Sequence, residues 1–286
     1  MGRGYAWGGM MESIQSLIGY QRAEFDIAAK LFRRKFGIQA SLAAVGASSI
    51  LVVDSETIYW MAAISLVIML VWLWLELKYR SVRSNAERAR RATLIMGGLG
   101  KPISLAELND IQECLVASEE EAKIQEDPDY FASNSPAGAA RLSEILEEST
   151  YWTLNLQRVS ARVMWFAFVV VLLGSGGSFL ALLPSASSTE MMTIARVICS
   201  ILVFAVGADL FGAARAYSDT VRTLDRLMHR FDSAKARGYP EADLLLMLSD
   251  YNAAVENTPL NLPLVYAFKK KKLNQNWARR RAASVG

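Results

Sequence analysis

Hydrophobic residues are gathered into four blocks along the chain, at residues 37–53, 58–75, 163–183 and 191–212. A helix needs about 17–25 residues to cross a hydrocarbon core roughly 30 Å thick, and all four blocks reach that length. A buried helix of a soluble bundle keeps a polar stripe, whereas the second block, IYWMAAISLVIMLVWLWL, has almost no polar residue. We therefore expect an all-α integral membrane protein with four transmembrane helices.

The connections within each pair of blocks are short. Residues 54–57 join the first pair and residues 184–190 join the second, so each pair should form an antiparallel hairpin. Neither connection contains Lys or Arg, whereas basic residues flank the outer ends of both hairpins. Because loops rich in Lys and Arg stay on the cytoplasmic side, both termini are expected in the cytoplasm.

The remaining sequence predicts cytoplasmic helical extensions. Residues 97–100 (GGLG) should end one helix, and Ser104 with Glu107 forms a capping-box pattern that opens the next. A helix from Ala139 should continue unbroken into the third block, and a helix after a Gly-Tyr-Pro break should end near Glu256. The expected organisation is an N-terminal amphipathic helix at 11–36, a first transmembrane hairpin at 37–75, a central cytoplasmic helical region at 76–162, a second transmembrane hairpin at 163–212, and a C-terminal cytoplasmic helical region with a basic tail at 213–286.

Charge is distributed unevenly between these regions. Residues 213–286 carry a net charge of +6 and residues 78–162 carry −2, so parts of the two regions are complementary. Attraction of the basic tail to anionic inner-leaflet lipid is a second interpretation. The N-terminal helix is expected to pack against other soluble helices rather than on lipid, because it contains Glu12, Glu24 and Asp26.

The composition argues against several kinds of site. One histidine and two cysteines exclude a His-rich or Cys-rich metal centre. His229 has no nucleophile motif near it, and no Gly-rich phosphate-binding loop follows a predicted strand. We therefore expect no catalytic residue, no metal and no cofactor, and the protein is not expected to be an enzyme. A net charge of +3 gives no reason to expect a DNA or RNA partner.

Two ionisable residues, Arg196 and Asp209, lie in the fourth block, which is expected to continue as one helix into the C-terminal region. Charged residues in membrane helices are costly and usually face a bundle interior, a cavity or a partner. Asp209 is close to the inner end of its block, so a position at the membrane interface is equally open. Small residues at 174–178 and in the first block predict close helix packing, including packing between subunits of a homo-oligomer.

Three stretches of the sequence resemble a known family. They are Ser135-Pro136-x-Gly138-x-x-Arg141-Leu142-x-Glu144 leading into Glu148-Ser149-x-x-Trp152-Thr153; Asp250-Tyr251-Asn252 followed by Pro259 and Pro263; and Tyr266 followed by Leu273-Asn274 and Trp277. With the two hairpins, they resemble the bacterial four-transmembrane effector domain associated with SMODS nucleotidyltransferases and SLOG proteins. The similarity spans nearly the whole chain, although Asn261 departs from the more apolar stretch expected between the two prolines.

The resemblance implies a role in anti-phage defence. A partner nucleotidyltransferase would make a cyclic oligonucleotide, and the membrane protein would respond by compromising the bacterial inner membrane, which stops growth of the infected cell. Such a ligand needs cations for its phosphates and flat faces for its bases. The expected pocket forms where residues 141–158 meet residues 251–277, with Arg141, Trp152, Tyr251 and Asn252 as candidates.

Other interpretations remain open at this point. The candidate pocket residues could instead hold the soluble helices together. The protein could be an ion channel or transporter with Asp209 in the path, or a non-enzymatic membrane scaffold that uses its basic tail to hold a partner.

Overall fold

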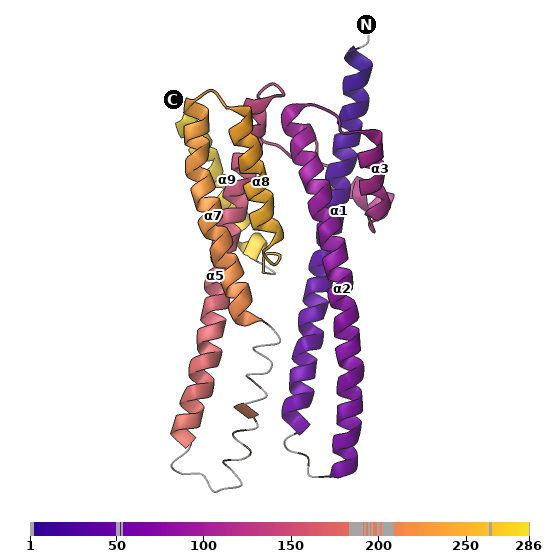
Figure 1. Ribbon diagram of the computed structural model, residues 1–286, viewed down its shortest axis with the longest axis vertical. Helices are drawn as coiled ribbons and strands as arrows, with labels where there is room; N and C mark the ends of the chain where they lie inside the picture. Colours follow the sequence, from indigo (N-terminus) through magenta and orange to yellow (C-terminus); the bar gives the residue numbers. More distant parts are fainter. Residues whose placement is uncertain are drawn as a thin grey trace. The chain divides into compact units, whose positions relative to one another are not determined.

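The computed structural model describes the backbone of residues 3–49, 52, 54–182, 191, 193, 195, 197–198, 201, 209–262 and 265–285. This part of the chain is helical and contains no strand, which confirms the predicted all-α class (Figure 1). Its helices are α1 (Arg3–Ser48), α2 (Ser55–Leu99), α3 (Leu105–Cys114), α4 (Glu119–Gln125), α5 (Ala139–Leu182), α7 (Leu210–Ala236), α8 (Glu241–Glu256) and α9 (Val265–Val285).

The chain forms two compact units. Unit 1 comprises Met1–Ala29, Arg80–Val159 and Tyr217–Gly286, and unit 2 comprises Lys30–Tyr79 and Ser160–Ala216. The long helices α1, α2 and α5 each contribute residues to both units. The two predicted transmembrane hairpins fall within unit 2 by residue number.

Unit 1 has a conventional hydrophobic core. Its larger cluster joins α5, α7 and α8 through buried residues that include Ile145, Leu224 and Leu244. A second cluster packs Ile14 and Leu17 of α1 against α2 and α3. The N-terminal part of α1 therefore packs against α2 and α3.

Glu24 shows why a carboxylate is tolerated on the packed face of α1. It is buried, and its Oε1 accepts hydrogen bonds from the backbone N–H groups of Val116 and Ala117, the latter at 2.7 Å. Burial raises the pKa of this carboxyl, and the two backbone donors partly offset that effect. Glu24 thus ties α1 to the turn that joins α3 and α4.

The ends of several helices follow local sequence signals. Ser104 caps α3 by accepting the Glu107 N–H, as predicted. The segment after α2 turns at Gly100, whose φ is 64°, a left-handed conformation that suits glycine. α5 runs from Ala139 through the start of the third block, and α8 ends at Glu256. Pro240, the last residue of the predicted Gly-Tyr-Pro break, is the N-cap of α8.

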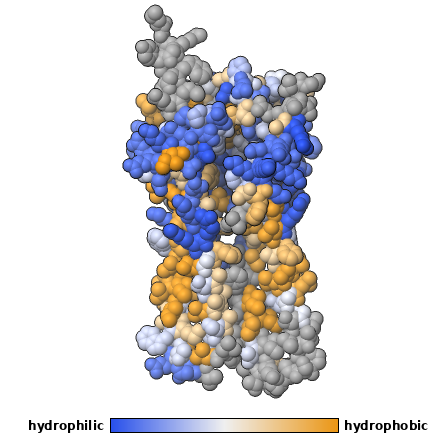
Figure 2. Space-filling model, turned by 180° about the vertical axis from the view of Figure 1, so that it is seen from behind, coloured by the Kyte–Doolittle hydropathy of each residue, from blue (hydrophilic) through white to orange (hydrophobic). Residues whose placement is uncertain are grey.

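Unit 2 differs from unit 1 in the chemistry of its exposed surface. α2 and α5 are long and apolar enough to cross a membrane, and only 6% of the most apolar 18-residue window of α2 is buried. Large exposed side chains include Tyr59, Trp60 and Val67 on α2 and Phe166 on α5. Figure 2 colours much of the surface of these apolar segments as hydrophobic. The first block forms the described end of α1, and most of the fourth block lies outside the described residues.

Candidate functional site

The two segments expected to form a pocket do meet in unit 1. The Tyr251 hydroxyl of α8 lies 3.2 Å from the Thr153 hydroxyl of α5. On α9, the Trp277 ring centroid lies 5.0 Å from that of Tyr151. The Tyr266 and Trp152 ring centroids are 6.2 Å apart. α5, α8 and α9 therefore bring aromatic side chains together, and we call this place the aromatic junction.

The four candidate residues occupy different environments. Tyr251 and Asn252 are buried, and the Asn252 Oδ1 atom has no hydrogen-bond partner among the described residues. Trp152 is half-buried beside Tyr266. Arg141 is engaged elsewhere, because its Nε donates to the Gly97 carbonyl at 2.9 Å and its Nη1 donates to the Ser135 carbonyl at 3.0 Å. Of the four, Trp152 keeps partial exposure without a hydrogen bond that commits it to the scaffold.

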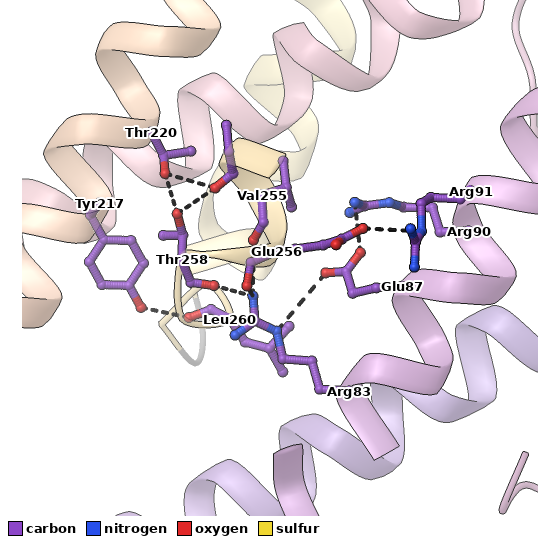
Figure 3. A network of polar contacts seen from close by, with 11 residues as sticks. Arg83, Glu87, Arg90, Arg91, Tyr217, Thr220, Val255, Glu256, Thr258 and Leu260 are labelled. Carbon is purple, nitrogen blue, oxygen red and sulfur yellow. Dashed lines mark hydrogen bonds and ion pairs between the residues drawn. The ribbon is translucent and has the colours of Figure 1, made fainter. Parts of the chain in front are cut away.

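A charged network of α2 and α8 contacts Tyr251 of this junction through Arg90. Figure 3 shows the charged residues of the network. The Arg90 guanidinium carbon lies 5.2 Å from the centroid of the Tyr251 ring, a cation–π contact. Arg90 Nη2 is 2.6 Å from Glu87 Oε2, and Arg83 Nε is 4.0 Å from the other oxygen of the same carboxylate. Arg91 pairs with Glu256 of α8 at 3.2 Å. We call Arg83, Glu87, Arg90, Arg91 and Glu256 the stalk cluster.

The Glu87–Arg90 pair at the centre of the stalk cluster is desolvated, whereas the Arg91 and Glu256 side chains are 46% and 32% exposed. The side chains of Glu87 and Arg90 are 4% and 11% exposed. Burial raises the pKa of the Glu87 carboxyl, and the neighbouring Arg90 and Arg83 act in the opposite direction. A buried carboxylate of this kind depends on its cationic partners, so removal of one partner leaves a charge without compensation.

Arg83 also fixes the end of α8. Its Nη2 donates to the carbonyls of Val255 at 3.0 Å and Glu256 at 3.3 Å, and to that of Thr258. Carbonyls at a helix C-terminus have no partner within the helix and carry partial negative charge, so a cation there stabilises the end. α2 is thereby joined to the end of the helix that carries Tyr251.

α7 holds the same end of α8 from a second helix. The Tyr217 hydroxyl donates to the Leu260 carbonyl at 2.6 Å. The Thr220 hydroxyl donates to the Ala254 carbonyl at 3.0 Å, and the Thr258 hydroxyl donates to that carbonyl at 2.8 Å (Figure 3). No motif in the sequence indicated this network. The spacing of Arg83, Glu87 and Arg90, which places them on one face of a predicted helix, is the sequence feature that could have revealed it.

The structure corrects the expected continuity of the fourth block. Asp209 has a φ of 47°, and α7 begins at Leu210 rather than continuing unbroken through this position. The exposed Asp209 carboxylate accepts the Gly212 N–H at 3.0 Å, and its carbonyl accepts the Ala213 N–H at 2.8 Å. Asp209 is therefore the N-cap of α7. Arg196, the other candidate of this block, lies outside the described residues.

The described residues contain no group of His, Cys, Asp and Glu side chains arranged to hold a metal ion. In comparisons with known proteins, no protein-family model matches the sequence, and no curated protein or solved structure shows significant similarity to it.

Proposed function

We propose that the protein is a four-span membrane effector with both termini in the cytoplasm. In this proposal a cyclic oligonucleotide from a partner nucleotidyltransferase binds unit 1. The bound state of a homo-oligomer then compromises the bacterial inner membrane as an antiviral response. The family resemblance is the reason to propose a cyclic oligonucleotide as the signal and membrane damage as the response. Contacts within unit 1 suggest how binding of the ligand could move α2.

The single observation that carries the membrane part is the surface of α2. Residues 58–75 expose aromatic and aliphatic side chains such as Trp60, Val67 and Leu70, whereas residues 80–99 are packed in unit 1. Burial of one large apolar side chain is favourable by about 1.5–3 kcal/mol, so water is a poor solvent for a helix that exposes many of them. A bilayer removes that cost.

The aromatic junction is the proposed ligand site. Trp152 and Tyr266 offer faces for bases, and the Lys270 ammonium lies 5.8 Å from the centroid of the Tyr266 ring, where it can meet a phosphate. Tyr251 and Asn252 remain candidates as buried residues of the adjoining part of α8, and Arg141 remains a candidate whose hydrogen bonds lie at Gly97 and Ser135.

The stalk cluster is the proposed route of the signal. Thr153, next to Trp152, contacts Tyr251, and Tyr251 contacts Arg90 of α2. A ligand that moves Trp152 would displace the end of α8 and the stalk cluster together. Because α2 is one unbroken helix, a shift of its packed half is transmitted to its apolar half.

The topology can be tested in intact cells with an impermeant thiol reagent. Exposed Cys114 of unit 1 serves as the internal cytoplasmic reporter, and Ser55→Cys reports on the connection between the first two blocks. In a Cys199→Ser background, Ser55→Cys should react in intact cells and Cys114 should react only after lysis. Reaction of Cys114 in intact cells would contradict a cytoplasmic unit 1.

Ligand binding can be tested by thermal unfolding of the purified protein with a panel of cyclic oligonucleotides. A ligand at 100 times its Kd adds about 2.7 kcal/mol to stability, so one member of the panel should raise Tm clearly. Lys270→Gln should weaken this ligand by about tenfold or more, because a charge-assisted hydrogen bond contributes about 1.5–3 kcal/mol. Lys271→Gln, on another face of α9, should respond like the parent. No shift with any cyclic oligonucleotide would contradict the signalling proposal.

The alternative of a channel with Asp209 in the path has no separate support among the described residues. Its carboxylate is occupied at the N-terminus of α7 by the Gly212 N–H.

A further inference from the structure

Beside Tyr266 and Lys270 of the proposed ligand site, the first turns of α9 carry a second exposed surface. Phe268 is 80% exposed, although it lies in unit 1, whose other aromatic side chains are mostly covered. Lys269–Lys272 follow it directly, and the last three of these lysines are exposed. We propose that Phe268, Lys271 and Lys272, which we call the α9 anchor, bind the anionic phospholipid headgroups of the leaflet that α5 enters. This inference rests on the membrane integration proposed above.

The contacts between α9 and α5 determine where the anchor lies along α5. Arg280 pairs with Glu147 at 3.0 Å, and Trp277 stacks near Tyr151, which is one turn further along α5. Val265 and Leu273 pack in one cluster with Leu156, further along still. α9 is therefore antiparallel to this part of α5, and its N-terminal turns lie toward the apolar end of α5.

The position of Leu156 sets the depth of the anchor. Leu156 precedes Val163, the first residue of the apolar segment, by seven residues of the same helix, which is about 10 Å of rise. The headgroup layer on one side of a bilayer is several ångströms thick outside a hydrocarbon core of about 30 Å. The remaining few ångströms are within the reach of the long Lys271 and Lys272 side chains when α5 enters the bilayer near Val163.

Charge and shape both match an anionic lipid surface. No Asp or Glu follows Glu256 in the sequence, so no acidic residue of α9 or of the segment before it competes for the four lysines. Lys271 and Lys272 lie three and four residues after Phe268, and these three side chains share the face of α9 opposite buried Leu273 and Trp277. An aromatic side chain inserted among headgroups with adjacent lysines on phosphates is a recurrent interfacial arrangement.

The test uses the full-length protein reconstituted in vesicles, in a Cys114→Ser and Cys199→Ser background. An environment-sensitive fluorophore is attached through Phe268→Cys, and the control fluorophore is attached through Ile124→Cys on α4, where the side chain is 82% exposed. A quencher carried on shallow lipid positions reports contact with the headgroup layer. Vesicles of phosphatidylcholine alone are compared with vesicles that also contain phosphatidylglycerol.

The proposal expects strong quenching at Phe268→Cys in phosphatidylglycerol vesicles and weak quenching at Ile124→Cys. Lys271→Gln with Lys272→Gln should lower the ratio of docked to undocked anchor by about fivefold for each lysine. The matched pair Lys101→Gln with Lys123→Gln, two exposed lysines elsewhere in unit 1, should leave the ratio unchanged.

Three results would overturn the anchor. These are equal quenching at the two positions, quenching at Phe268→Cys that does not depend on lipid charge, and a fluorescence change that requires added cyclic oligonucleotide rather than anionic lipid. Extraction of the protein from vesicles by alkaline carbonate would instead contradict the membrane integration. The two failures are therefore distinguishable.

Discussion

The two halves of α2 differ in the relation between hydrophobicity and burial. In residues 80–99 the buried positions are mostly small, as at Ala86 and Ala89, and charged Glu87 is buried among them. In residues 58–75 the exposed positions are the largest apolar ones, including Trp60 and Val67. Both halves belong to one helix, so backbone propensity does not distinguish them. The difference fits the proposed membrane integration, in which the apolar half faces lipid while the other half packs in unit 1.

The most damaging change should be the removal of Arg90 from the packed half. Arg90→Ala leaves the buried Glu87 carboxylate without its nearest cation, and loss of one partner of a buried ion pair costs about 3–5 kcal/mol. Unfolding in mild detergent, monitored at pH 8, measures this loss. Arg222→Ala removes the arginine of an exposed pair with Asp219 and should change stability by less than about 1 kcal/mol. Equal effects of the two variants would contradict a desolvated Glu87–Arg90 pair.

The cost of Arg90→Ala should depend on pH. Burial raises the folded-state pKa of Glu87 above its ordinary value of 4.5, so the stability it contributes is complete at acid pH and declines as pH rises through the raised pKa. Without Arg90 that pKa rises further, because Arg90 lowers it in the parent. The deficit of Arg90→Ala should therefore shrink as pH falls toward 4.5. Adding Glu87→Gln to Arg90→Ala should remove this pH dependence, and a persistent dependence would point to another group.

A charge placed in the apolar half should prevent insertion. Val67 lies near the middle of the second block and is 60% exposed. Val67→Lys should cost about 2.5–3.5 kcal/mol of membrane insertion, which is the range for a charge at the centre of a span. The carbonate-resistant fraction of the protein measures the loss. Ile124→Lys, at an apolar position of unit 1 that is 82% exposed, should leave that fraction unchanged. If Val67→Lys were harmless, this surface of α2 would face water.

Two glycines on α1 test the contrast between the packed unit 1 and the exposed surface of unit 2, with smaller expected effects. A Cβ atom on Gly19 would lie 2.3 Å from the Ala122 carbonyl oxygen, so Gly19→Ala should cost about 1–3 kcal/mol through overpacking. A Cβ on Gly37 meets no atom within 4 Å. Gly37→Ala should therefore stabilise the helix by up to about 1 kcal/mol. Thermal unfolding of the two variants checks the signs, and destabilisation by Gly37→Ala would indicate that a second subunit packs closely there.

Local signals in the sequence accounted for much of the fold. The Ser104 cap, the glycine turn at Gly100 and the end of α8 at Glu256 each depend on residues within one turn of the boundary, so they were predictable. The apolar blocks likewise predicted that α2 and α5 would each contain a helical segment long and apolar enough to cross a membrane.

The candidate site was less predictable, because its contacts join residues far apart in the sequence. The guanidinium of Arg141 binds the carbonyl of Gly97, which no local pattern indicates. The burial of Tyr251 and Asn252 depends on which face of α8 meets α5 and α2, and α8 is apolar on several faces. Hydropathy also averages over a block, so it did not reveal the turn at Asp209 inside the fourth one.

Substitutions of Asp209 should have small effects on stability. They distinguish a helix-capping role from a role in an ion path. Asp209→Ala removes the acceptor for the Gly212 N–H, and loss of an N-cap costs about 0.5–2 kcal/mol. Asp209→Asn keeps a side-chain oxygen and should retain most of the stability, because Asn caps about as well as Asp. A capping residue therefore predicts that membrane damage by the activated protein is impaired in the Ala variant and close to normal in the Asn variant. A carboxylate in an ion path predicts that both variants lose activity, since Asn carries no charge. Unfolding measured beside activity for the two variants decides between these roles.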